Sequence, residues 1–316
     1  LDAATNRKGK PNENFAREVM ELFTLGEGRY TEADVREAAR AFTGWSIEPD
    51  TGEFRFRPQQ HETGTKMVLG RSGDFDGDAV LDVLLAQPAT AEFVVAKLMR
   101  EFVTPEPDPG AVKRVAARFR DSRYDIRTTL RAMLASEAFW APQHRGVLIK
   151  SPVDLVVGTM RTFDLSMENA VPLALITAGL GQNLMAPPNV RGWPGGEAWI
   201  NSSTLLARRQ FAERVFRADD PRMAPAAMAR GADDRDLLRG RGVAAMGPEG
   251  RARLGQAFAE IRFDGDAWAR ELGRAPTTAD IERLVLALPP VGALPAEGSV
   301  RERVRAATLD PVYQLK

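Results

Sequence analysis

The stretch that decides the fold is NENFAREVMELFTLG, residues 12–26. Its apolar side chains Phe15, Val19, Leu22 and Phe23 follow the i, i+4, i+7, i+8 spacing of an amphipathic helix. A second helix is expected after Thr31, a residue type that caps helices well. Similar patterns, separated by short breaks, predict helices at 78–86, 89–103, 109–121, 126–136, 152–164, 170–180 and 202–217, with weaker ones near 249–262, 277–287 and 300–308.

One region interrupts this helical pattern. Between Gly44 and Gly77 the chain is punctuated by glycine and proline, and apolar and polar residues alternate in FRFR (54–57) and again near 67–69. Alternation of this kind is typical of a half-buried strand. We therefore expect an all-α fold, a multi-helix globular bundle with a small β-hairpin or loop element near residues 53–70.

Composition excludes several classes of protein. Lys and Arg together number 43, as do Asp and Glu, so no overall positive field attracts nucleic acid. No apolar run is long enough for a transmembrane helix. The chain has no cysteine and two histidines, which excludes disulfides, thiolate metal sites and any site that needs three histidines. A shift toward Asp, Arg, Gly and Pro predicts a helical core at 1–217 and a C-terminal helical extension at 218–316.

Charged residues line the helix at 12–26. Glu13, Arg17 and Glu21 stand four residues apart in one row, and Asn14 and Glu18 form the adjacent row. Such an array can tie helices together as a half-buried ion-pair network, or it can offer carboxylates to a metal or substrate. Both interpretations remain open at this point.

A lone histidine offers a second candidate. His61 precedes Glu62 and Lys66 in a glycine-bearing loop, where an imidazole can serve as a general base, as a metal ligand or as a structural hydrogen-bonding group. The chain lacks both the zincin motif and the Glu-x-x-His pairs of a di-iron bundle. Only an oxygen-rich site with His61 as its one nitrogen ligand stays open, and we predict no resident metal and no cofactor.

The third candidate is the loop PPNVRGWPGGEAWINS, residues 187–202. Trp193 and Trp199 can form a stacking platform for a sugar, with Asn189, Glu197 and Asn201 as polar contacts. A loop so rich in turn residues can equally be an ordered plug whose tryptophans fill the core.

Several of these motifs occur in an order that resembles the bacterial family catalogued as domain of unknown function 1800. The resemblance implies a protein that is often exported, and it implies members that are longer at the N-terminus, so a missing N-terminal segment is an expected partner of this chain. It also implies a co-encoded partner from domain of unknown function 1501. No established activity comes with the family, so it transfers no catalytic residue. The stretches that carry the resemblance are 12–26, 30–35, 41–45, 61–70, 87–91, 187–202 and 310–315.

Two functions follow from these observations. The first is a binding or assembly module outside the cytoplasm, whose ligand is a polysaccharide or a co-encoded secreted protein. The second is a carboxylate-dependent hydrolase or lyase, so the question of catalysis stays open. The predicted catalytic residues are Glu18, Glu21, Arg17 and His61, and the predicted ligand-binding residues are Asn14, Lys66, Asn189, Trp193, Glu197 and Trp199.

Overall fold

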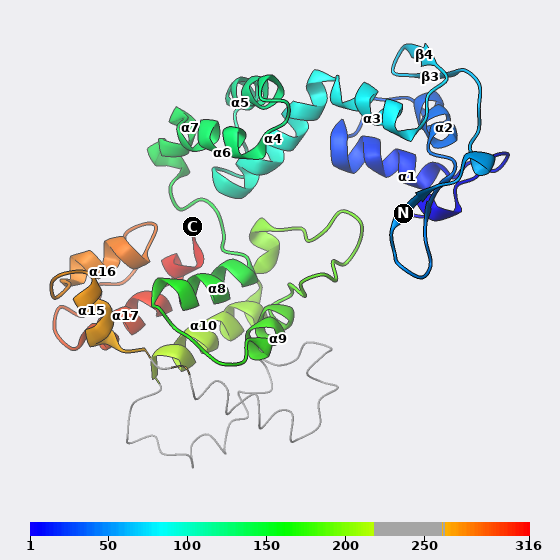
Figure 1. Cartoon of the computed structure of the whole chain (residues 1–316). Coiled ribbons are helices and arrows are strands. Elements are labelled where there is room, and N and C mark those ends of the chain that lie inside the picture. Colours follow the sequence, from blue (N-terminus) through cyan, green and yellow to red (C-terminus); the bar gives the residue numbers. More distant parts are fainter. Residues whose placement is uncertain (218–260, 262) are drawn as a thin grey trace. The chain divides into compact units, whose positions relative to one another are not determined.

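The computed structural model describes residues 1–217, 261 and 263–316. Within these ranges the chain forms thirteen α-helices and two small antiparallel sheets of two strands each (Figure 1). The predicted fold, mainly helical with small β elements, is confirmed. The weaker helix expected near 249–262 lies almost wholly outside the described residues.

The chain divides into two compact units, Leu1–Ala141 and Pro142–Lys316, and each is described by itself. The core at 1–217 and the extension at 218–316 remain a prediction. Short 3₁₀ turns connect the main elements: η1 (Ala3–Thr5), η3 (Pro58–Gln60), η4 (Pro142–His144), η5 (Gly196–Trp199) and η6 (Pro311–Gln314).

The first unit begins with two packed helical segments. Helix α1 (Glu13–Glu18) starts where the side chain of Asn12 accepts the Asn14 N–H, and it continues into the π-helical segment η2 (Val19–Thr24). Helix α2 (Glu32–Ala41) starts with a capping box between Thr31 and Asp34. A shared core of buried apolar residues joins these elements, among them Ala16, Met20, Leu25, Val35 and Phe42.

Two hairpins follow α2. Strands β1 (Trp45–Ile47) and β2 (Phe54–Phe56) form the first, and β3 (Lys66–Val68) and β4 (Arg71–Gly73) form the second. Gly44 makes the entry to β1 possible, because its φ of +87° suits glycine and an added Cβ would lie 2.8 Å from the Arg57 carbonyl oxygen. The β element therefore begins earlier than the predicted hairpin at 53–70.

The rest of the first unit is helical. Helices α3 (Gly77–Leu85), α4 (Pro88–Phe102), α5 (Pro109–Asp121), α6 (Ile126–Leu134) and α7 (Glu137–Trp140) follow in order. A second core forms between α4, α5 and α6 around Val95, Met99, Val115, Phe119 and Met133. Among the described residues no single helix is both long and apolar enough to cross a bilayer, although α3 and α4, bent by 73° at their junction, meet that criterion as a pair by length and composition.

The second unit has a single core. Its helices are α8 (Pro152–Thr162), α9 (Val171–Gly179), α10 (Ser202–Arg217), α15 (Gly265–Glu271), α16 (Thr278–Val285) and α17 (Val300–Leu309). Phe163, Phe216, Phe263 and Trp268 form a cluster of edge-on and tilted rings with centroids 4.8–6.0 Å apart. Helices α10 and α17 pack against each other in this core, so elements on both sides of residue 218 share it.

Candidate functional site

The hairpin of β1 and β2 exposes apolar side chains on one of its faces. Trp45 pairs with Phe56 and Ile47 with Phe54, so these four side chains lie on the same side of the sheet. Ile47, Phe54 and Phe56 are 55%, 64% and 41% exposed, whereas the polar Ser46 on the other side is buried. The apolar side of this hairpin is thus only partly covered, because Trp45 packs on the core whereas the other three side chains are exposed. We call Ile47, Phe54 and Phe56 the hairpin face.

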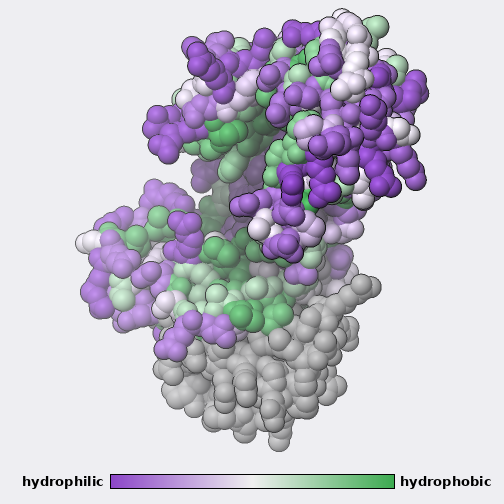
Figure 2. Space-filling model, turned by 45° about the vertical axis from the view of Figure 1, so that its right-hand side comes forward, coloured by the Kyte–Doolittle hydropathy of each residue, from purple (hydrophilic) through white to green (hydrophobic). Residues whose placement is uncertain are grey.

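A row of aromatic rings ties the hairpin face to the core. Phe54 meets the edge of Trp45 with ring centroids 5.3 Å apart, Trp45 meets Phe42 at 5.1 Å, and Phe42 meets Phe15 at 5.0 Å. Edge-on contacts of this kind hold the rings in fixed positions. In the space-filling view hydrophilic side chains cover much of the visible surface and apolar residues interrupt it in patches (Figure 2). Exposed apolar groups held on a rigid support are typical of contact surfaces.

His61 lies beside this face. Its ring centroid is 5.5 Å from that of Phe56, and its Nδ1 is 3.0 Å from the carbonyl oxygen of Thr43. A carbonyl oxygen can only accept, so Nδ1 carries a proton, and in the neutral imidazole Nε2 then presents its lone pair. In the described part of the chain Nε2 makes no hydrogen bond. The half-buried imidazole is thus oriented by the backbone and offers one acceptor next to an exposed ring.

Side chains around Thr43 build the support for His61. The Thr43 hydroxyl donates to the Arg40 carbonyl at 2.6 Å and accepts the Glu62 N–H at 2.7 Å. The Glu62 carboxylate accepts from Arg40 Nε at 3.0 Å and from the Gly9 N–H at 3.4 Å. Burial works against the charge of Glu62, but these donors hold the pKa of its carboxyl below the ordinary value. Glu62 therefore connects helix α2, through Arg40, with the N-terminal segment at Gly9.

Lys66, a predicted ligand-binding residue, also has a structural role. Its side chain is fully buried, and Nζ donates to the Gly64 carbonyl at 3.1 Å and to Asp74 at 3.3 Å. The hydrogen bond from Lys66 lowers the pKa of the exposed Asp74. The ammonium faces the loop between β2 and β3 and the segment after β4, where no face of it is open to a ligand.

Arg17 forms an ion-pair network at the other end of α2. Its guanidinium donates to both carboxylate oxygens of Glu32 at 2.7 Å and to Glu13 at 3.2 Å. The hydrogen bonds from Glu32 raise the pKa of Arg17, and the same bonds lower the pKa of Glu32. The helix becomes π-helical after Glu18, which changes the register of Glu21 relative to Glu13 and Arg17 in the predicted row.

The other predicted residues of this segment take separate positions. Glu21 accepts from the Tyr30 hydroxyl at 3.0 Å, and burial together with this bond raises the pKa of Tyr30. The exposed Asn14 donates to Asp2 at 3.2 Å. Glu18 is half-buried, and its carboxylate has no hydrogen-bond partner among the residues that the structure describes.

The structure does not bring Arg17 and His61 together. Glu32, the partner of Arg17, begins α2, whereas Thr43, the partner of His61, follows its end. Because an α-helix rises about 1.5 Å per residue, these two anchor points are roughly 16 Å apart along the helix axis. A single bond undergoing reaction cannot touch both groups, so Arg17 and His61 do not act together at one bond.

The loop residues predicted to bind a sugar lie in the second unit. Trp199 is 7% exposed and fills the core, while Trp193 is half-buried. Asn189 uses its side-chain oxygen to accept the N–H of Arg191 at 2.9 Å, which closes a turn within the loop. Glu197 is exposed in η5. With Trp199 buried, the two tryptophans do not present a common surface.

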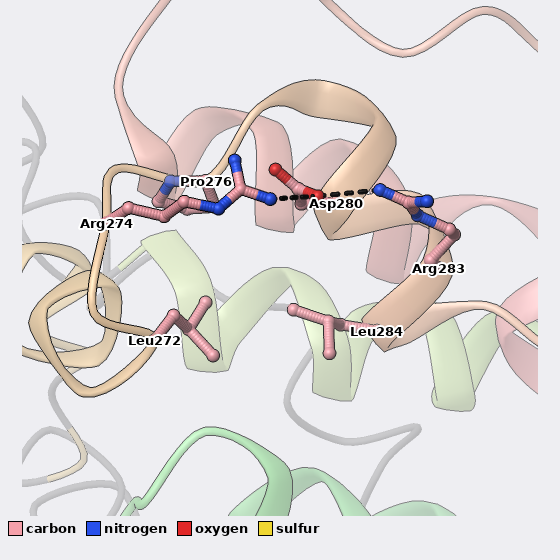
Figure 3. A pocket seen from close by; sticks show the side chains of 6 residues that line it. All are labelled: Leu272, Arg274, Pro276, Asp280, Arg283 and Leu284. Atoms are coloured by element: carbon pink, nitrogen blue, oxygen red, sulfur yellow. Dashed lines mark hydrogen bonds and ion pairs between the residues drawn. The ribbon is translucent and has the colours of Figure 1, made fainter.

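A shallow cavity of about 260 Å³ in the second unit lies beside α16 (Figure 3). Asp280 stands at its rim between Arg274 at 2.9 Å and Arg283 at 2.8 Å. The same carboxylate also accepts the N–H and hydroxyl of Thr277, and these bonds lower the pKa of Asp280 strongly. The oxygens of Asp280 are therefore already occupied by Thr277 and the two arginines, and few acceptor positions remain for a ligand.

Over the described ranges 1–217, 261 and 263–316, no group of three or more His, Cys, Asp or Glu side chains is placed to hold a metal ion. The alternation at 54–57 predicted a half-buried strand there, but it did not predict that Phe54 and Phe56 would be exposed. The buried Asn6 donates to the Ala39 carbonyl and accepts the Asn12 N–H. No pattern in the sequence predicted this structural role.

Comparison with known proteins gives one match. The model of the family described as "Protein of unknown function (DUF1800)" matches residues 1–291. No curated protein and no solved structure matches the chain.

Proposed function

This chain belongs to the DUF1800 family, whose name states no activity, and we propose from its own residues that it is a binding module that contacts a polysaccharide. The observation that carries the proposal is the hairpin face, with Ile47, Phe54 and Phe56 between 41% and 64% exposed beside the oriented imidazole of His61. A sugar ring has an apolar face that packs on aromatic rings and hydroxyl groups that need polar partners. The hairpin face and His61 offer both.

The polar groups around the hairpin face favour a sugar over a purely apolar ligand. His61 Nε2 can accept a hydrogen bond from a hydroxyl, and the half-buried Arg57 begins the turn that leads from β2 to His61. Arg55 and Glu48 form an ion pair on the other side of the hairpin, so they are not required for the contact. His61 and Arg57 therefore offer a few polar contacts to a sugar whose apolar face packs on the hairpin face.

Location outside the cytoplasm of a bacterium is part of the same proposal. The resemblance described above implies export, and a chain without cysteine is compatible with an oxidising compartment. The co-encoded protein of domain of unknown function 1501 is the proposed protein partner. It is not needed for the polysaccharide contact itself.

The test is retention of the purified chain on insoluble bacterial envelope polysaccharides. We expect Phe54→Ala combined with Phe56→Ala to weaken binding at least tenfold, because stacking on an aromatic ring contributes about 1 kcal/mol or more. The matched control is Phe102→Ala, which removes a ring that is 48% exposed at the end of α4, away from the hairpin. The control is expected to bind like the wild type.

Two results would overturn the proposal. One is that the wild-type chain binds no polysaccharide in the set. The other is that the hairpin variant and the Phe102→Ala control bind equally well. If the hairpin variant instead loses only co-purification with the co-encoded protein, the face is a protein interface and the ligand class proposed here is wrong.

A carboxylate-dependent hydrolase or lyase is the second candidate. The half-buried Glu18, which has no hydrogen-bond partner in the described ranges, and the free Nε2 of His61 are the observations that favour it. Under this alternative Glu18→Gln and His61→Ala each abolish polysaccharide cleavage with little change in Tm. Under our proposal neither wild type nor variant releases soluble sugar during the binding assay.

A further inference from the structure

Arg208 in α10 is a fully buried cation with unused hydrogen-bond donors. Its side chain is 0% exposed, and its Nη1 donates to the side-chain oxygen of Gln314 at 3.1 Å. Its Nε and Nη2 have no hydrogen-bond partner in the part of the chain that the structure describes. A buried guanidinium in this condition is costly, because water no longer solvates it and protein groups do not replace that solvation.

The two unused donors form one edge of the guanidinium. The Nε–H and the nearer N–H of Nη2 point in parallel along the same side of the plane, which is the fork that binds carboxylate and phosphate oxygens in pairs. Gln314 occupies Nη1, which lies away from this edge. The bidentate edge of Arg208 is therefore left intact by its one protein partner.

Lys150 is a second cation close enough to Arg208 to feel its charge. Its backbone N–H donates to the Gln314 carbonyl at 2.8 Å, so Lys150 and Arg208 both adjoin the same residue. Its Nζ lies 3.8 Å from the ring centroid of Tyr313. Burial lowers the pKa of Lys150 to about 8, and the positive charge of Arg208 acts in the same direction. Lys150 is half-buried, so it is the more accessible of the two cations.

The nearby carboxylate does not satisfy Arg208. Asp154 accepts from Lys316 Nζ at 2.6 Å and from the backbone N–H of Ser151 at 3.0 Å, where it completes the capping box of α8. Its negative charge is thus shared with Lys316. Asp154 acts electrostatically on both Arg208 and Lys150 but is already paired with Lys316, so an added anion would lower the cost of burying these two cations.

We propose that Arg208 and Lys150 form a binding site for an oxyanion, a carboxylate or a phosphate, held side-on by Nε and Nη2 of Arg208 and contacted by Lys150 Nζ. The site lies within 142–316 and does not depend on the hairpin face, which belongs to the other unit. A small ligand that carries such a group, free or at the end of a larger molecule, is the expected occupant.

The test is a titration of the whole chain with inorganic phosphate and, separately, with acetate, followed by thermal unfolding and calorimetry. Sodium chloride at equal ionic strength is the reference. We expect at least one of the two anions to raise Tm by several degrees above the chloride reference, in a concentration-dependent manner. Which anion acts decides between the phosphate and the carboxylate.

Variants separate this site from general salt effects. Arg208→Met is expected to weaken anion binding at least tenfold and, without added anion, to unfold at a Tm equal to or above that of the wild type. Arg208→Lys keeps the charge but loses the fork, and it is also expected to weaken binding at least tenfold. Arg209→Met, which removes an exposed arginine from the same helix, is the matched control and is expected to respond like the wild type.

The proposal is wrong if neither anion stabilises the wild type beyond chloride, or if Arg208→Met and Arg209→Met respond alike. It is also wrong if Arg208→Met lowers Tm in anion-free buffer while anion binding is retained. If Arg208→Met does not fold, Lys150→Met takes its place, with a loss of at least tenfold in affinity expected and unchanged affinity as the refuting result.

Discussion

Two rings of one aromatic row should differ sharply in their importance for stability. Phe42 is 1% exposed and Phe54 is 64% exposed, although both pack edge-on against Trp45. Full burial of a phenylalanine contributes about 1.5–3 kcal/mol, so the buried third of Phe54 contributes about 0.5–1 kcal/mol. With about 0.5–1.5 kcal/mol for the ring pair, Phe54→Ala should cost roughly 1–2.5 kcal/mol. Phe42→Ala should cost about 3–5 kcal/mol, because it also leaves a cavity.

Amide hydrogen exchange of α2 is the suitable assay, since it reports opening of the first unit without interference from unfolding of the second. Phe54→Ala should reduce the protection of α2 slightly, and Phe42→Ala should reduce it by about a further 2–3 kcal/mol. Equal losses in the two variants would refute the reasoning. Phe54 would then be part of the folded core, and the hairpin face would not be a free surface.

Three further predictions concern other parts of the molecule. Trp199→Ala should destabilise the chain by about 3–5 kcal/mol in urea unfolding and leave polysaccharide retention unchanged, because Trp199 is buried. Thr31→Ala should cost about 1 kcal/mol in the exchange of α2, because it removes the capping box. Lys150, whose folded pKa of about 8 lies below its unfolded value near 10.4, destabilises the native state while it is charged. Stability should therefore rise by up to about 3 kcal/mol between pH 8 and pH 10.4 in the wild type relative to Lys150→Met. An equal pH dependence of wild type and Lys150→Met in urea titrations would contradict this assignment.

Local pattern was enough to predict most of the helices. The expected helices at 109–121 and 202–217 coincide with α5 and α10, because each has a clear apolar stripe and a proline or serine at its start. The short helices α7 and α15 were not expected, since four and seven residues are too few for periodicity to stand out. Strand β1 was also missed, because its three residues are too few for alternation to stand out.

Side-chain roles were harder to predict, because they depend on contacts between distant segments. The row of charges at 12–26 indicated an ion-pair network, but its main carboxylate is Glu32 on the next helix, and the change to π-helix moved Glu21 toward Tyr30. The apolar stripe of α10 (Phe211, Ala212, Val215 and Phe216) includes position 208 at the i, i+3, i+4, i+7, i+8 spacing, so the local sequence could have placed Arg208 on the buried face. Its unused donors follow only from the packing of α10 against the C-terminal segment.

The most direct test of the hairpin face as the contact surface uses the two histidines of the chain. His61 adjoins Phe56 in the first unit, whereas His144 lies in the second, so imidazole NMR spectra contain one reporter and one internal control. On titration with a soluble fragment of a retained polysaccharide, the account predicts that the His61 signals shift and those of His144 do not. Binding that leaves the His61 signals unchanged would contradict it.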